Sequence, residues 1–487
     1  MMRSRHLESL LVVGLLSGIW ILAGERARAA GPIPTIGTET QIFVDDALIA
    51  QKSGVVRKAH PCKKLFEPVM TPEKPWEQEG EDRRIYVYGT VLADEPNRQL
   101  RMWYNRNHLV LYATSTDGLK WERPELGLHL FEGSRENNLV LPDFHSPSVV
   151  YNDRERERVK HYQMLGYGRL YGRGYYAAHS EDGIEWRLHP RNPVLPGGDT
   201  CTLALDPKTG EYLAFHKRTH VYQGKNRRLV YLATSPDMQH WSEPELVLAP
   251  DETDDEQVRL EGGRYSQFYN MSVFPYGGQF LGLVTHFRYT GPPPVPGPLQ
   301  SGDDGPVDVQ LVHSRDGRAW QRCEDRSPVI PNGPHDYDAG CVLGVTNGPV
   351  VAGDELWLYY TGITTTHGGF VPDKKITIAL ARWRLDGFVS LDADRAGGVV
   401  ETVPLRFSGD RLVVNADAAG GELTVTALDE QGRPLWGYFE ADCVPLRTDS
   451  VRHEVRWKDR DRLPRGQAIR LRFQGKSFRL FGYAVTK

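Results

Sequence analysis

The chain has 487 residues, of which 40% are hydrophobic, enough to bury a large core and to form two or three domains. Lys and Arg number 59 against 63 Asp and Glu, and the net charge of -4 excludes the strong basic excess that is typical of nucleic-acid-binding proteins. The five cysteines are widely scattered, without CxxC or CxxH spacing, so we expect no disulfide framework, no metal site and no other cofactor.

Residues 1–30 have the pattern of a secretory signal peptide. Arg3 and Arg5 form a basic start, residues 10–23 are apolar, and Ala27 and Ala29 stand at the positions that signal peptidase recognises. The apolar stretch is shorter than the roughly 20 residues that cross a bilayer, and a retained N-terminal anchor is the alternative. We therefore expect a secreted or periplasmic protein that has left the membrane after cleavage. Its oligomeric state is not predicted.

A short motif, Ser-x-Asp-Gly-x-x-Trp, organises the middle of the chain. Its copies are residues 115–121, 180–186, 235–241 and 314–320, with a degenerate fifth copy at 381–387. An Asp side chain can accept hydrogen bonds from backbone N–H groups two residues on, and Gly adopts the positive φ of a tight turn. We expect the Trp to fold back into the gap to the neighbouring repeat. The motif is interpreted as architectural rather than as a binding site.

Each copy of the motif follows a hairpin of alternating hydrophobic residues. The hairpins are expected at 86–104, 148–165, 200–216, 270–285 and 341–360. Repeats of this length in an all-β chain indicate propeller blades. The sequence therefore predicts an all-β fold with a five-bladed β-propeller over residues 38–390, and we expect the strand at 41–46 to complete the ring beside the last blade.

The rhythm of the sequence changes after residue 390. Strands with clean alternation are predicted at 411–415, 422–428, 451–457 and 468–473. Closely spaced strands of this kind favour a β-sandwich of jelly-roll type, which we assign to residues 391–487.

Acidic residues recur just before the first strand of several blades, where side chains converge on one mouth of a propeller funnel. The catalytic candidates are Asp45 or Asp46, Asp199, Glu261 and Asp338. Glycosyl transfer uses such acids, because one carboxylic acid protonates the leaving oxygen while a second carboxylate attacks or activates water. The acidic segment 251–256 is interpreted instead as solvated surface or a cation-binding loop.

Basic and polar residues near the ends of the central strands form a second group. The candidate substrate-binding residues are Glu81, Arg106, His145, His216, Arg218, Tyr269, His286 and His367. Such groups hydrogen-bond sugar hydroxyls or bind sulfate, carboxylate or phosphate. The expected partner is therefore a carbohydrate, with anionic and sulfated sugars included, and not a nucleic acid.

The repeated SxDGxxW turns, the opening segment 43–46 and the sequence Trp320-x-Arg322 resemble the five-bladed glycoside hydrolases of the family 32, 43 and 68 type. The chain is most similar to secreted bacterial relatives of the family 32 N-terminal domain. This resemblance implies a glycosidase that degrades a plant or algal polysaccharide. The leading hypothesis is a secreted glycoside hydrolase that cleaves a poly- or oligosaccharide with paired carboxylates. A carbohydrate-binding propeller without catalysis and a phosphorolytic glycoside phosphorylase remain the alternatives.

Overall fold

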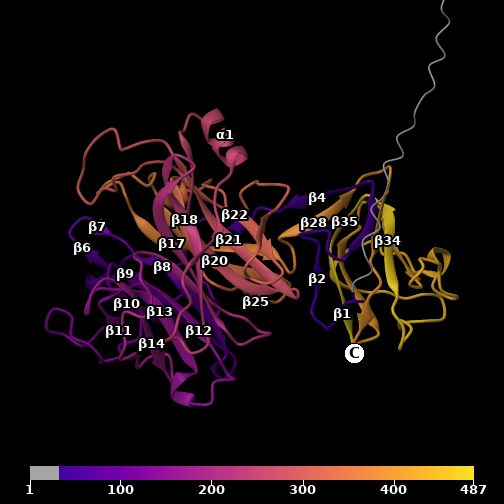
Figure 1. Ribbon diagram of the computed structural model, residues 1–487, viewed down its shortest axis with the longest axis horizontal. Coiled ribbons are helices and arrows are strands. Elements are labelled where there is room, and N and C mark those ends of the chain that lie inside the picture. The colour runs from indigo at the N-terminus through magenta and orange to yellow at the C-terminus, as the bar shows by residue number, and fades with distance from the viewer. Residues whose placement is uncertain (1–31) are drawn as a thin grey trace, which may run out of the picture.

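The computed structural model describes residues 32–487, which are almost entirely β-structure with one α-helix, α1 (Glu252–Leu260). The all-β prediction is confirmed, whereas the predicted signal peptide at 1–30 lies outside the described residues. Figure 1 shows two groups of strands, a larger one on the left and a smaller one on the right. Within 32–487, no helix has the length and apolarity needed to cross a membrane.

The larger group consists of five sets of antiparallel strands, named here units 1 to 5 in chain order. Unit 1 contains β8 (Tyr86–Asp94), β9 (Gln99–Arg106), β10 (Leu109–Ser115) and β11 (Leu139–Pro142). Unit 2 contains β12 (Phe144–Tyr151), β13 (Tyr162–Gly168), β14 (Gly174–Ser180) and β15 (Arg187–Leu188). Unit 3 contains β16 (Cys201–Leu205), β17 (Tyr212–Tyr222), β18 (Lys225–Ser235) and β19 (Glu245–Leu248).

Units 4 and 5 share one sheet, because β22 and β24 pair at Val307 and Cys341. Unit 4 contains β20 (Tyr265–Tyr276), β21 (Gln279–Tyr289), β22 (Val307–Ser314) and β23 (Trp320–Arg322). Unit 5 contains β24 (Cys341–Val345), β25 (Val350–Ala352), β26 (Glu355–Ile363), β27 (Ile376–Arg384) and β5 (Lys63–Lys64). The five predicted hairpins are thus confirmed as the leading strands of the five units.

The first strands of the units contact one another in a cycle. β8 contacts β12, β12 contacts β16, β16 contacts β20, β20 contacts β24, and β24 contacts β8. Asn347, which follows β24, links three units: its amide donates to Ser148 Oγ at 3.1 Å and to the Leu203 carbonyl at 2.7 Å, and its Oδ1 accepts from Thr90 Oγ1 at 2.8 Å. The side chains before these strands are therefore brought toward a common centre.

The repeated turn has the structure that its sequence predicts. In the first copy, Asp117 Oδ1 accepts from the backbone N–H of Leu119 at 2.8 Å, and Gly118 has a φ of +72°. The Trp contacts the preceding unit: Trp121 lies 5.3 Å from the ring of Tyr359 in unit 5, and the pairs Trp186–Trp103 and Trp320–Phe215 repeat this contact. The motif therefore joins neighbouring units, as expected.

The smaller group is a two-sheet sandwich with one hydrophobic core between the sheets. One sheet contains β2 (Gln41–Ile42), β4 (Val55–Ala59), β28 (Val389–Ala393), β31 (Arg411–Asp417), β33 (Asp449–Glu454) and β35 (Phe478–Thr486). The other contains β3 (Ile49–Ser53), β29 (Gly398–Thr402), β32 (Glu422–Leu428) and β34 (Arg470–Lys476). The four strands predicted after residue 390 correspond to β31, β32, β33 and β34. Two small sheets pair β1 (Thr35–Ile36) with β30 (Arg406–Phe407) and β6 (Gln78–Glu79) with β7 (Asp82–Arg83).

The placement predicted for the strand at 41–46 was wrong. β2 pairs with β35 of the sandwich, while β5 is the strand that pairs with β27 in unit 5. The physical reason is the burial of Phe43, whose ring lies 5.9 Å from Tyr483 and 6.3 Å from Phe473 in the sandwich core. An aromatic side chain of this size directs the segment to the core that can bury it.

The acidic segment 251–256 was interpreted as solvated surface or a cation-binding loop, but in the structure it forms the start of α1. Asp251 caps the helix by accepting from the backbone N–H of Asp254 at 3.1 Å. Asp254 and Asp255 are buried, and arginines neutralise both, with Arg322 2.7 Å from Asp254 and Arg227 2.9 Å from Asp255.

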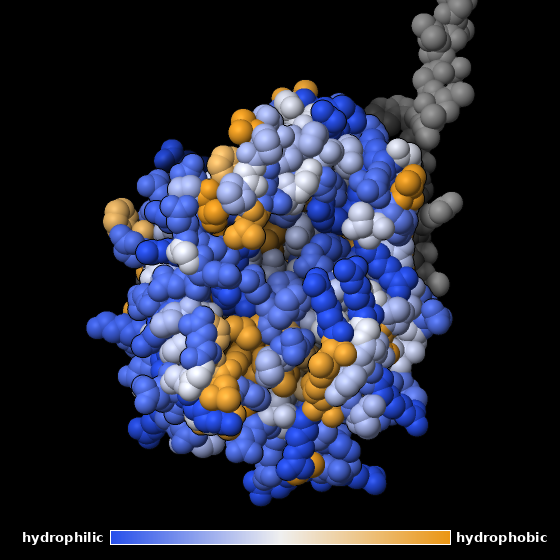
Figure 2. Space-filling view, turned by 90° about the vertical axis from the view of Figure 1, so that its left-hand side faces the viewer, coloured by the Kyte–Doolittle hydropathy of each residue, from blue (hydrophilic) through white to orange (hydrophobic). Residues whose placement is uncertain are grey.

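Figure 2 shows the side of the molecule opposite the sandwich as mainly hydrophilic, with hydrophobic side chains gathered near the middle of the face.

Candidate functional site

Unusual backbone conformations mark the beginnings of β12 and β16. Asp199, just before β16, has a φ of +84°, which residues other than glycine rarely adopt. Asp143 and Ser146, on either side of the start of β12, have φ values of +57° and +55°. Strained residues of this kind cluster at functional sites, where the surrounding structure holds them in place.

The carboxylate of Asp199 collects side chains from three units. Lys217 of β17 donates to its Oδ2, and His145 of β12 places Nε2 3.3 Å from its Oδ1. Tyr269 of β20 donates its hydroxyl to the same carboxylate at 3.4 Å. The Asp199 side chain remains 37% exposed, so a ligand can reach it, while Lys217 is only 10% exposed.

The charges around Asp199 keep it ionised. Burial alone would raise the pKa of Asp199, but the Lys217 ammonium and the His145 ring outweigh burial and hold that pKa well below its ordinary value. Burial and the neighbouring Asp199 charge both raise the pKa of Tyr269, so the Tyr269 hydroxyl keeps its proton and remains a donor. At neutral pH the site therefore presents the ionised carboxylate of Asp199.

His145 is held from both sides. Its Nδ1 lies 2.8 Å from the Asn107 carbonyl oxygen, and its Nε2 faces the Asp199 carboxylate. The side-chain amide of Asn105 also lies 3.2 Å from Nδ1. These contacts fix the orientation of the His145 ring beside Asp199.

Tyr269 is the centre of a cationic and aromatic wall. The Lys217 ammonium lies 4.2 Å from its ring centroid, the Arg228 guanidinium 5.0 Å, and the His367 ring 5.2 Å. Arg228 also pairs with Asp303 at 2.8 Å, and the Asp303 side chain is 38% exposed. A second accessible carboxylate is thereby connected to Asp199 through Arg228 and Tyr269.

Of the predicted residues, the structure brings together Asp199, His145, Tyr269 and His367. Asp45 and Asp46 lie beside the sandwich, where Asp45 pairs with Arg315 at 2.5 Å and Asp46 pairs with Arg57. Neither has a hydrogen bond or ion pair with Asp199.

Asp338 belongs to a separate buried ion pair. Its Oδ2 lies 2.5 Å from Lys64 Nζ and accepts from the Tyr360 hydroxyl at 2.7 Å. Its side chain is 0% exposed, so no substrate can touch it without opening unit 5. This geometry indicates that the Lys64–Asp338 pair is structural and holds β5 against the rest of unit 5.

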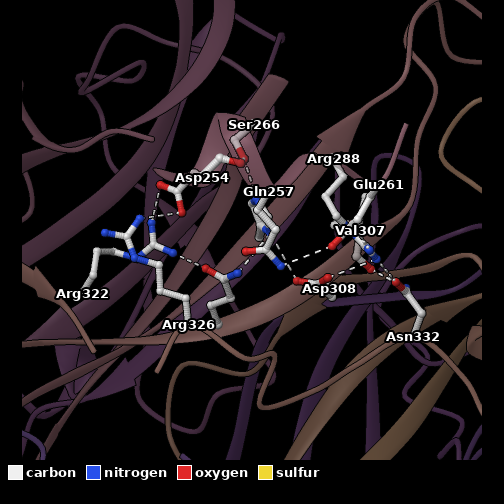
Figure 3. Close-up of polar contacts among 12 residues, drawn as sticks. Asp254, Gln257, Glu261, Ser266, Arg288, Val307, Asp308, Arg322, Arg326 and Asn332 are labelled. Carbon is white, nitrogen blue, oxygen red and sulfur yellow. Dashed lines mark hydrogen bonds and ion pairs between the residues drawn. The ribbon is translucent and has the colours of Figure 1, made fainter. Parts of the chain in front are cut away.

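Figure 3 shows Glu261 in a polar network with Arg288 and Asp308 of unit 4, and His286 contacts the same Asp308. Glu261, at the C-terminal end of α1, pairs with Arg288 at 2.8 Å, and Arg288 pairs with Asp308 at 3.1 Å. His286 Nε2 lies 2.6 Å from Ser266 Oγ, and its Nδ1 lies 3.5 Å from Asp308. This order resembles a Ser-His-Asp triad, but all three side chains are buried, so a substrate has no access to the serine.

Within residues 32–487, the remaining predicted residues make no hydrogen bond or ion pair with Asp199. Arg106 is buried and pairs with Glu79 at 2.9 Å, and Glu81 is exposed on the turn between β6 and β7. His216 and Arg218 are on β17 with Lys217, but the alternation of the strand places them on its opposite face.

Comparison with known proteins finds solved structures with weak similarity. No protein-family model matches the sequence, and no curated protein matches it. An N-acetylgalactosamine deacetylase from F. plautii, in complex with blood group B trisaccharide, is 16% identical, with 68% of this chain and 96% of that chain covered and a TM-score of 0.45. The Bombyx mori GH32 beta-fructofuranosidase BmSUC1 is 11% identical, with 87% and 94% covered and a TM-score of 0.41. An endo-arabinase from Bacteroides thetaiotaomicron is 12% identical, with 63% and 96% covered and a TM-score of 0.39. Similarity at this level assigns neither a family nor an activity.

Sequence reasoning missed three residues of the site: Lys217, Arg228 and Asp303. Lys217 stands between His216 and Arg218 in the sequence. Predicting its role required knowing which face of β17 is directed at Asp199. Asp303 lies in the Gly- and Pro-rich segment 291–306, where an Asp pair between glycines is a visible signal for a loop that approaches a ligand. Arg228 has no signal of its own, because its role depends on contact with Tyr269.

Proposed function

We propose that units 1 to 5 are the blades of a five-bladed β-propeller and that Asp199 lies at the mouth of its funnel. The cycle of contacts among the first strands supports this architecture. The bonds from Asn347 to three units support a closed centre. We also propose that the protein is exported, on the basis of the signal-like pattern at residues 1–30.

The proposed activity is hydrolysis of a glycosidic bond in a poly- or oligosaccharide. The observation that carries it is the ionised carboxylate of Asp199, held in an accessible position by Lys217, His145 and Tyr269. In this proposal Asp199 attacks the anomeric carbon or activates water while the glycosidic C–O bond breaks and the leaving oxygen takes a proton from Asp303. Asp303 is the second carboxylate, because it is exposed and belongs to the same wall of side chains.

The experiment compares three single substitutions on a panel of poly- and oligosaccharides, with release of reducing ends as the readout. Asp199→Asn and Asp303→Asn are expected to lower kcat by about a hundredfold or more, because each removes a group that acts in the transition state. Glu261→Gln is the matched control: it also neutralises an exposed, arginine-paired acid, but one on α1. Full turnover by Asp199→Asn, with an unchanged melting temperature, would remove the proposal.

A phosphorolytic reaction is the second candidate, and one feature favours it. Lys217, Arg228 and His145 surround a single directly contacting carboxylate, an arrangement that suits inorganic phosphate as the nucleophile. Turnover that requires phosphate and yields a sugar phosphate would identify this reaction. Glycan binding without bond cleavage in the presence or absence of phosphate would instead identify a carbohydrate-binding propeller.

A further inference from the structure

His216 is a buried histidine whose two ring nitrogens have no hydrogen-bond partner within residues 32–487. The side chain is 1% exposed. Burial and the nearby Arg218 charge lower the pKa of His216 to about 3, so the ring is neutral and carries one donor and one acceptor. Leaving a buried polar group without a partner is unfavourable, so the neighbours of His216 bear on what this face of β17 binds.

Arg218 lies beside His216 on the same face of β17. Its guanidinium is 5.2 Å from the ring centroid of Tyr231, a ring that lies 6.2 Å from His216. Within residues 32–487, no carboxylate lies within 4.0 Å of Arg218 and its side chain makes no hydrogen bond. It differs in this respect from Arg228 on β18, which has Asp303 as its counter-charge. Arg218 is half-buried and has all of its N–H groups available.

This face of β17 is close to the proposed reaction site. The His216 ring lies 5.3 Å from the ring of Tyr175, and the Tyr175 hydroxyl donates to the carbonyl of Thr200 at 3.0 Å. Thr200 directly follows Asp199 in the chain. Tyr175 therefore links His216 to the segment that carries Asp199.

A second arginine, which has no carboxylate within 4.0 Å among residues 32–487, borders the same segment from unit 2. Arg169 donates to the Tyr167 hydroxyl at 3.1 Å, and its guanidinium lies 5.4 Å from the Tyr167 ring centroid. The Tyr167 ring is packed closely against the chain before Asp199, since a Cβ on Gly198 would lie 3.4 Å from it. Arg169 is exposed. Positive groups thus lie on both sides of the segment that carries Asp199.

We propose that Arg218, with Arg169 at the rim, forms a subsite for an anionic substituent of the sugar, either a uronate carboxylate or a sulfate ester. This inference rests on the proposed glycan-cleaving function and names the substrate class of the same mouth. A guanidinium presents two parallel N–H groups that match the oxygens of carboxylate or sulfate. An anion also provides the counter-charge that the half-buried Arg218 lacks.

The test measures binding by isothermal titration calorimetry rather than turnover. The probes are an oligogalacturonide, a sulfated galactan oligosaccharide and a neutral xylo-oligosaccharide, each titrated into the wild-type protein, Arg218→Gln and Arg173→Gln. Arg173 is the matched control, because it is exposed and lies four residues after Arg169 in the same loop. The wild type is expected to bind one anionic probe at least about tenfold more tightly than the neutral one, and Arg218→Gln is expected to lose that difference.

Each outcome decides the inference. Loss of anion preference in Arg218→Gln, with unchanged affinity for the neutral probe and an unaltered Arg173→Gln, supports it; the probe that responds distinguishes carboxylate from sulfate. Equal affinity of the wild type for all three probes overturns it, as does an Arg218→Gln protein that keeps its preference. If Arg218→Gln does not fold, Arg169→Gln is measured instead and is expected to weaken the same probe by a smaller factor. If Asp199→Asn loses turnover but Arg218→Gln keeps the anion preference of the wild type, the subsite is refuted and the hydrolase proposal is retained. If the anion preference depends on Arg218 but Asp199→Asn keeps full turnover, the hydrolase proposal is refuted and the subsite is retained.

Discussion

Replacing Lys64 with Met tests whether the Lys64–Asp338 pair stabilises the position of β5 in unit 5. The Lys64 ammonium has three acceptors: Asp338 Oδ2 at 2.5 Å and the carbonyls of Pro331 and Gly333 at 2.5 and 2.7 Å. Without it, the fully buried Asp338 carboxylate retains the hydroxyl of Tyr360 at Oδ2, while its Oδ1 already has no partner within residues 32–487. Breaking a buried pair by removing one member costs about 3–5 kcal/mol, because the remaining charge is left uncompensated.

The assay is urea unfolding followed by tryptophan fluorescence and circular dichroism. Lys64→Met is expected to lower the free energy of unfolding by about 3–5 kcal/mol, whereas Lys63→Met, an exposed neighbour in the same strand, is expected to change it by less than about 0.5 kcal/mol. Adding Asp338→Asn to Lys64→Met is expected to restore part of the loss, because it removes the stranded charge. A cost below about 1 kcal/mol, or one equal to that of Lys63→Met, would refute the reasoning.

Three further predictions concern the centre of the larger group. Lys217→Met removes the cation that offsets the burial of Asp199, so the pKa of Asp199 is expected to rise and the acidic limb of the kcat/KM profile to move toward neutral pH; an unmoved limb contradicts this. Because the folded-state pKa of Asp199 is depressed, its ionisation stabilises the fold above the unfolded-state pKa near 4, and this contribution is lost as the pH falls through the folded-state value. The difference in unfolding free energy between the wild type and Asp199→Asn should therefore shrink in urea titrations below about pH 4, and a pH-independent difference would argue against it. Asn347→Ala is expected to cost about 2–3 kcal/mol in the same urea assay, because groups of three units lose their partner at once; a loss below about 0.5 kcal/mol would show that the link is not important.

Local features of the chain were predictable from the sequence because their causes lie within a few residues. The turn at 115–121 depends on an Asp side chain that bonds the next N–H groups and on a glycine with positive φ, and both are visible in the sequence. The hairpins follow from alternation and turn residues in the same way. Asp199 was singled out as a candidate because it stands just before the first strand of a unit, next to two glycines.

The partners of each acid were decided only by the tertiary structure. Asp338 also precedes a first strand, but Lys64, which is 274 residues away in the chain, turns it into a buried structural group. Lys217 and His216 are adjacent in β17, and the pairing of β16 with β17 decides which of them faces Asp199. Similarly, Phe43 joined the sandwich because the aromatic rings that bury it come from the end of the chain. A sequence determines local conformation through short-range bonds, whereas charge pairing and burial depend on segments that meet only after folding.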